Sequence, residues 1–292
     1  MSLLEAHLLC LLLFATDVLA RAWRIRWIMQ GLKHNLTLKD AFIINSLGDA
    51  ANSLTPMRIG GEPARFAGML RIRVPTTAAL LGIALEALVS RLVLAGVVLW
   101  VVWQLAPAWW LGVGPRLLAG VEEVWPWITL ILVAGFVLWR YAQRKVSPFT
   151  RRMRRSLGHA RIYWSRMSRW PLLVGIPLSL VSIAARVAML PVLALTLASP
   201  PPPSVLTFGS FSLLYSQMVL PTPSGAGVVD LGFLGGAAGE FAGDGWLLIA
   251  WRFYTTGLGV LLGVWFAARL YGWPALRKLV RKDGVEVRAS AR

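Results

Sequence analysis

The chain has 292 residues, is 57% apolar and carries a formal net charge of +17. Several apolar runs approach or exceed the roughly 20 residues that span a bilayer, which indicates a polytopic integral membrane protein rather than a soluble one. The single cysteine, Cys10, excludes an intrachain disulfide, and it cannot form a metal site with three widely separated histidines. We therefore expect no metal, no cofactor and, since the charge follows the membrane topology, no nucleic-acid partner.

Five apolar stretches predict full membrane spans, at about residues 1–20, 77–104, 124–141, 171–198 and 246–268. The first stretch lacks the basic residues that begin a signal peptide, so we expect it to remain as a span. Two further stretches, 41–57 and 204–221, are apolar but contain several polar residues. We expect each to enter the membrane and return through 60–71 and 225–242. The predicted fold is all-α, with two re-entrant helical hairpins.

The distribution of Lys and Arg supports this topology. Its cytoplasmic segments are 21–39, 58–73, 140–169 and 269–292. They contain 26 of the 30 Lys and Arg residues, whereas the outer loops contain Arg116 alone. Such a split is a strong positive-inside signal. It predicts a multi-pass protein of the cell inner (cytoplasmic) membrane, with its N-terminus outside and its C-terminus in the cytoplasm.

The two halves of the chain contain the same order of elements in opposite membrane directions. In each half a span precedes a re-entrant segment, a motif with proline, glycine and an acid, a short helix and a second span. This order predicts an inverted-topology repeat, as in many transporters. Residues 1–292 are then one membrane domain, made of a first repeat half (1–105), a connecting span with a basic loop (106–170), a second half (171–270) and a basic cytoplasmic tail (271–292).

Two motifs interrupt the apolar sequence, one at residues 56–62 (PMRIGGE) and one at residues 221–230 (PTPSGAGVVD). Irregular backbone at membrane depth is tolerated where protein or a water-filled cavity satisfies it, and paired breaks mark transporter binding sites. The predicted turn residues are Pro56, Gly60, Gly61, Pro221, Pro223, Gly225 and Gly227. A helix follows each turn, so we expect Glu62 and Asp230 in first turns. There they either cap the helix or face a cation, a proton or a basic partner.

Charged residues at membrane depth complete the predicted site. The substrate-binding candidates are Glu62, Arg65, Glu86, Arg91, Arg186, Ser224, Asp230 and Arg252. Buried charges face the bundle interior or an aqueous path, and arginine binds phosphate oxygens through two N–H groups. Charge compensation predicts that Glu86 pairs with Arg186 or Arg252. A static ion pair is the alternative for each charge, and a boundary side chain that snorkels is the alternative for Arg65.

Several motifs of the chain resemble those of a known family, the flippase-like membrane domain of lysylphosphatidylglycerol synthases and its stand-alone relatives. The similar parts are 21–24 (RAWR), 52–56 (NSLTP) leading to Gly61, Glu62 and Arg65, the whole motif 221–230, and Arg252. The chain departs from the family pattern at Ser224, where glycine is usual, at Asp230, where glutamate is usual, and at Ala87, which replaces an arginine. Arg91 appears instead.

The resemblance implies movement of lipid or glycolipid head groups across the membrane, so the expected function is a lipid translocator with a charged intramembrane cavity. The expected partners are membrane lipids with an anionic or glycosylated head group. About 24 residues follow the last span, which is too short for a synthase domain, so we expect no aminoacyl transfer. The alternatives are an intramembrane lipid-modifying enzyme and a non-transporting partner of such an enzyme. For an enzyme, Ser224 is the one tempting nucleophile, although a turn serine is favoured.

Overall fold

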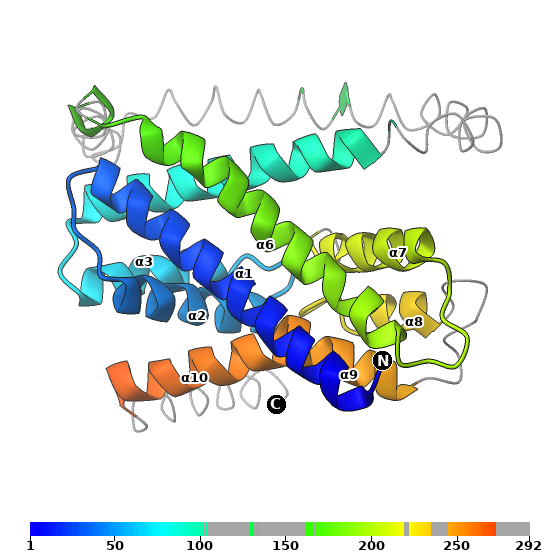
Figure 1. Cartoon of the computed structure of the whole chain (residues 1–292). Helices are drawn as coiled ribbons and strands as arrows, with labels where there is room; N and C mark the ends of the chain where they lie inside the picture. The colour runs from blue at the N-terminus through cyan, green and yellow to red at the C-terminus, as the bar shows by residue number, and fades with distance from the viewer. Residues whose placement is uncertain are drawn as a thin grey trace. The chain divides into compact units, whose positions relative to one another are not determined.

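The structure is a computed structural model, and it describes residues 1–101, 103, 129–130, 133, 162–165, 167–218, 222–234 and 245–272. This part of the chain is helical, and its extended pairing is limited to one isolated bridge. The helices labelled in Figure 1 are α1 (Leu3–Gly31), α2 (Leu38–Leu54), α3 (Gly61–Arg71), α6 (Trp170–Ala194), α7 (Pro203–Ser216), α8 (Val228–Leu234), α9 (Gly245–Arg252) and α10 (Leu258–Tyr271). A π-helical segment, η2 (Phe253–Gly257), joins α9 to α10.

Four of the helices are long and apolar enough to cross a membrane. They are Leu3–Gly31, Thr76–Val101, Trp170–Ala194 and Gly245–Tyr271, and they correspond to four of the five predicted spans. The remaining prediction, 124–141, lies outside the described residues except for 129–130 and 133. Large apolar side chains project outward from these helices, with Leu4 70% and Leu99 70% exposed. Such surfaces are suited to lipid contact, so the chain is a membrane protein.

Helices α1 and α6 lie side by side and run in opposite directions (Figure 1). Arg24 of α1 contacts Ser179, and Asp17, earlier in α1, contacts Ser182, later in α6. Helix α1 continues to Gly31, beyond residue 20 where the first span was predicted to end. Its extension carries Arg21 and Arg24, which are buried, and carboxylates of α1 and of neighbouring helices pair with them, as described below.

Helices α2 and α3 form the first hairpin. Thr37 caps α2 by accepting a hydrogen bond from the Asp40 N–H. The two helices are antiparallel and packed closely. A Cβ on Gly48 would lie 2.6 Å from Nε of Arg65, and one on Gly68 would lie 3.2 Å from Leu47. Because these glycines carry no side chain, the helices approach closely enough for Arg65 to cross α2.

Helices α7 and α8 form the second hairpin, and a Cβ on Gly232 of α8 would lie 3.4 Å from Leu213 of α7. Both predicted hairpins therefore exist as helical hairpins. Their re-entrant placement in a membrane and the full inverted repeat stay predictions. Residues Met1–Val89 and Met167–Arg292 form one compact unit, and Ser90–Arg166 form another. Everything described below as the site lies within the first unit.

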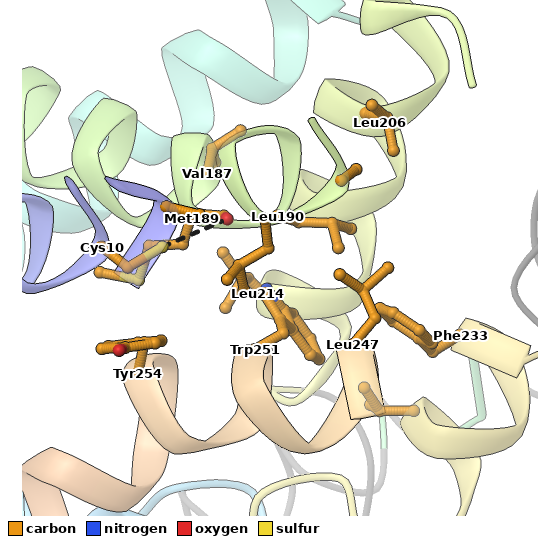
Figure 2. Close-up of a cluster of buried hydrophobic side chains, with 14 residues drawn as sticks. Cys10, Val187, Met189, Leu190, Leu206, Leu214, Phe233, Leu247, Trp251 and Tyr254 are labelled. Carbon is orange, nitrogen blue, oxygen red and sulfur yellow. Dashed lines mark hydrogen bonds between the residues drawn. The ribbon is translucent and has the colours of Figure 1, made fainter. Parts of the chain in front are cut away.

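A hydrophobic core joins the second hairpin to α6, α9 and the start of α1 (Figure 2). Trp251 is fully buried and stacks on Phe233, with 5.6 Å between ring centroids. Leu190 and Leu247 surround this pair. The π-helical η2 begins one residue after Arg252, and such segments are frequent at functional sites. The core therefore fixes the position from which Arg252 extends.

Candidate functional site

The first motif turns through two residues with positive φ. The Ile59 N–H donates to the Pro56 carbonyl, and the residues between them, Met57 and Arg58, have φ of 53° and 57°. Positive φ at both central positions is the pattern of a type I′ turn, in which glycine and asparagine are the preferred central residues. Helix α3 begins at Gly61, five residues after the proline.

The second motif repeats this geometry. The Ala226 N–H donates to the Pro223 carbonyl at 2.9 Å, and Ser224 and Gly225 between them have φ of 49° and 67°. Helix α8 begins at Val228, again five residues after the proline. Arg58 and Gly225 therefore occupy the same position in the two turns. Pro221, also predicted as a turn residue, lies outside the described residues.

The tips of the two hairpins meet. Pro56 and Pro223 form an isolated antiparallel bridge. Ser224 Oγ donates to the Ser53 carbonyl at 3.1 Å, and Arg58 Nη1 donates to Gln217 Oε1 at 3.1 Å. The two motifs therefore lie in contact, and Gln217, which was not among the predicted site residues, takes part in that contact.

A buried charge network joins α1, α2 and α6. Arg21 donates to both oxygens of Asp49 at 2.7 Å and to both oxygens of Asp17, with the shorter bond 2.8 Å. Arg186 Nε donates to Asp17 at 2.8 Å, and the Ser182 hydroxyl donates to the same carboxylate. Two arginines and two aspartates neutralise each other here, so a buried network of this kind holds three helices without excess charge.

A second network joins α1, α3, α6 and the helix Thr76–Val101. Arg24 donates to Oε1 of Glu86, and Arg65 Nη1 donates to Oε2 of the same carboxylate at 2.8 Å. Arg24 also donates to Ser179 Oγ at 2.9 Å. Glu86 is 2% exposed, and Arg65 has a buried Nε–H without a hydrogen-bond partner. In this second network two arginines pair with one glutamate, whereas in the first network two arginines pair with two aspartates.

The third charged group belongs to the second hairpin. Arg252 Nε donates to Asp230 Oδ1 at 2.8 Å, and its Nη1 donates to the Ser224 carbonyl at 2.8 Å. The Gly227 N–H donates to the other oxygen of Asp230 at 3.0 Å. Asp230 therefore both caps the start of α8 and pairs with Arg252. The sequence analysis left capping and a basic partner open as alternatives, and both apply to Asp230.

The predicted pairing of Glu86 with Arg186 or Arg252 is wrong, because those arginines pair with Asp17 and Asp230. Arg24 of α1, which follows the predicted span 1–20, is the partner of Glu86. The other candidates are distributed as follows. Glu62 lies in the first turn of α3 as predicted, with an exposed side chain, and Gly60 and Gly61 form the start of that helix. Arg91 is exposed and belongs to the second compact unit.

Sequence reasoning missed five charged members of the site, which are Asp17, Arg21, Arg24, Asp49 and Arg58. The sequence does contain a signal that Asp17 and Arg21 form an ion pair. Asp17 and Arg21 are four residues apart on a helix, which is the spacing of an ion pair on one face. Asp49 was recorded only as a polar residue of a re-entrant segment, and its partner on α1 cannot be read from spacing.

An all-helical membrane protein whose two hairpin tips meet beside buried arginine–carboxylate networks belongs to the class of membrane proteins with intramembrane charge sites. The model of the lysylphosphatidylglycerol synthase TM region matches residues 2–263, so the chain belongs to that family. The family expected from the sequence motifs is confirmed. Searches of curated proteins and of solved structures gave no match. Family membership makes this a lipid-related membrane protein.

Proposed function

We propose that this protein moves lipids with a polar, phosphate-bearing head group across the membrane. The observation that carries the proposal is the meeting of Pro56 and Pro223, which brings two irregular turns together among apolar helices. Breaks of this kind in corresponding halves are the sequence pointer to a transporter's binding site. The family match adds support, because the family is the TM region of lysylphosphatidylglycerol synthases, which are lipid-related proteins.

The charges beside the tips suit a head group. Six arginines of the first compact unit, Arg21, Arg24, Arg58, Arg65, Arg186 and Arg252, accompany four carboxylates, Asp17, Asp49, Glu86 and Asp230, in the contacts described above. Guanidinium groups bind phosphate oxygens through paired N–H groups, so a phosphodiester is the chemical class that fits.

In this proposal the structure represents a closed arrangement. The bridge between Pro56 and Pro223 and the hydrogen bonds from Ser224 to Ser53 and from Arg58 to Gln217 hold the two hairpins in contact. A head group passes when the tips separate, and arginines then exchange a carboxylate for a lipid phosphate. The acyl chains remain in the surrounding lipid. We further propose that the lipid is moved without chemical change, with the N-terminus outside and the C-terminus in the cytoplasm.

Reconstitution into liposomes tests this function. Liposomes of neutral phospholipid would contain a trace of labelled phosphatidylglycerol, and its leaflet distribution would be followed with and without the protein. We expect Arg252→Ala and Asp230→Ala to reduce transbilayer movement at least tenfold. Arg269→Gln is the matched control, because Arg269 is exposed and lies over Trp265 at 4.5 Å.

Two results would contradict the proposal. Movement no faster than in protein-free liposomes would exclude translocation of this lipid, and equal movement in the wild type and both variants would exclude a role for the site. Mass analysis of the recovered lipid separates transport from chemistry. A changed lipid mass would favour the lipid-modifying alternative.

A further inference from the structure

Arg58 differs from the other arginines of the site. Arg21, Arg24, Arg65, Arg186 and Arg252 each pair with a carboxylate. Arg58 donates one hydrogen bond, from Nη1 to Gln217 Oε1, and no carboxylate of the described chain lies within ion-pairing distance. The other N–H groups of its half-buried guanidinium therefore donate to no described residue.

The charged groups near Arg58 are already engaged. Its electrostatic neighbours are Arg186, Asp49 and Arg21. Asp49 accepts two hydrogen bonds from Arg21, and Arg186 pairs with Asp17. Arg58 thus adds a positive charge to a group that is otherwise balanced. A cation removed from water without a partner is strongly unfavourable, so an anion is the expected complement.

Gln217 supplies a second donor beside Arg58. Its side chain is 1% exposed, and its Nε2 has no hydrogen-bond partner within the described part of the chain. A guanidinium only donates, so the amide atom that accepts from Arg58 is the oxygen and the free atom is the nitrogen. An unsatisfied buried N–H of this kind calls for an acceptor. The two bonded side chains therefore both have N–H groups without an acceptor among the described residues.

The backbone at Arg58 has a conformation that glycine adopts more easily than arginine. Arg58 has φ of 57°, and Gly225 at the equivalent position of the second turn has φ of 67°. Glycine adopts this conformation without strain, whereas a residue with a Cβ does not. The first turn thus keeps an arginine where its counterpart uses the residue that suits the backbone.

We propose that Arg58 and Gln217 form a subsite that binds a phosphate group at the junction of the two hairpins. The subsite rests on the proposed function, because the phosphodiester of a translocated lipid would be its ligand there. Free phosphate shares the same chemistry and is the other source. Arg58 binds oxygens through its unused N–H groups, and Gln217 donates through Nε2.

The test measures ligand binding to the purified full chain in neutral detergent. The probes are dihexanoylphosphatidylglycerol, dihexanoylglycerol, which lacks the phosphate, and inorganic phosphate. We expect Arg58→Gln and Gln217→Glu each to weaken binding of the phosphate probe about tenfold or more, since each removes or neutralises a charge-assisted contact. Arg58→Lys should retain part of the affinity. Arg269→Gln should change binding less than twofold.

Gln217→Glu separates a binding role from a structural one. The new carboxylate would stand beside Arg58 and occupy the subsite from within the protein, so thermal stability should rise or stay constant while phosphate binding falls. Binding of the phosphate probes within twofold of wild type in both Arg58→Gln and Gln217→Glu would overturn the subsite. So would equal binding of dihexanoylglycerol, or no binding of any phosphate probe to the wild type.

The liposome assay distinguishes failure of the subsite from failure of translocation. Phosphate binding that depends on Arg58, without lipid movement by the wild type, would support the subsite and exclude transport. Lipid movement that is the same in the wild type, Arg58→Gln and Gln217→Glu would support transport and overturn the subsite. Binding of inorganic phosphate without binding of the short-chain lipid would assign the subsite to free phosphate.

Discussion

Arg252 and Asp230 bind each other across the second hairpin, with Arg252 Nε donating to Asp230 Oδ1 at 2.8 Å. The same guanidinium donates to the Ser224 carbonyl, whose residue has a positive φ. Arg252 therefore connects the last spanning helix to the turn that meets the first hairpin. Arg252 thereby supports the turn through which the second hairpin contacts the first.

Truncation of this arginine should loosen the second turn. We expect Arg252→Ala to lower the free energy of unfolding by about 1 kcal/mol, because a part-buried carbonyl and a part-exposed carboxylate lose their donor. Arg252→Lys should recover part of the loss, since one ammonium cannot serve both acceptors in the same geometry. Chemical unfolding in detergent, followed by tryptophan fluorescence, measures both. An Arg252→Ala protein as stable as Arg269→Ala would show that these bonds contribute nothing.

Glu86 should be the most sensitive single position of the buried networks. Glu86→Gln leaves Arg24 and Arg65 beside a neutral amide, and removal of one partner from a buried ion pair costs about 3–5 kcal/mol. A second substitution, Arg65→Leu, removes one of the two uncompensated cations. The double variant should therefore be more stable than Glu86→Gln alone.

The comparison is made as a double-mutant cycle of unfolding free energies. Coupling between the two positions should exceed about 1 kcal/mol, because the side chains are in direct contact. Additive losses would indicate that the 2.8 Å bond between Arg65 and Glu86 has no energetic weight.

The glycine at position 48 should control the position of Arg65. A Cβ there would lie 2.6 Å from Arg65 Nε and 2.8 Å from its Cγ, so Gly48→Ala forces the arginine to move. Gly209 is the matched control, because it is also helical and a Cβ there has no atom within 4 Å. Helix propensity favours alanine at both sites by up to about 1 kcal/mol.

We therefore expect Gly209→Ala to be neutral or stabilising and Gly48→Ala to be destabilising. Thermal unfolding of the two variants in the same detergent provides the measurement. If both variants gain stability alike, the packing of α2 against α3 is looser than the structure indicates.

The sequence identifies the helices and turns of this fold better than it identifies which side chains pair between them. Hydropathy locates four of the helices because a run of apolar residues specifies a span whatever lies beside it. Proline and glycine locate both turns, since few other residues interrupt a helix. The first span was predicted to end at residue 20 because a charge in a helix suggests the membrane boundary, whereas α1 continues to Gly31. Arg21 and Arg24 are buried instead, and their neutralising carboxylates come partly from other helices.

Pairing between distant residues is the information that a single sequence lacks. Arg186 was found as a buried charge, but its partner, Asp17, is 169 positions away and reaches it only because α1 and α6 are antiparallel. The choice of Glu86 as its partner used charge alone. Arg58 was overlooked for a different reason. Its role depends on a turn conformation and on Gln217, and neither has a signature in composition or spacing.

Contact between the tips can be tested with a disulfide. Residues paired across an antiparallel bridge have Cα atoms about 4.5–5.5 Å apart, which is within the range that a disulfide spans. Pro56→Cys with Pro223→Cys, in a Cys10→Ala background, should therefore cross-link on mild oxidation. Since Cys10 is the one native cysteine, no competing bond forms. Cross-linking is read as a mobility change on gels without reductant.

If lipid movement requires the tips to separate, oxidation should reduce transport in liposomes at least tenfold, and reductant should restore it. Each single-cysteine variant, treated in the same way, controls for loss of a proline and for oxidation itself. Efficient cross-linking with unchanged transport would mean that lipids move while the tips stay together, and the closed arrangement would then not be a gate. Absence of cross-linking would place the tips apart in the membrane and remove the main support for a shared site.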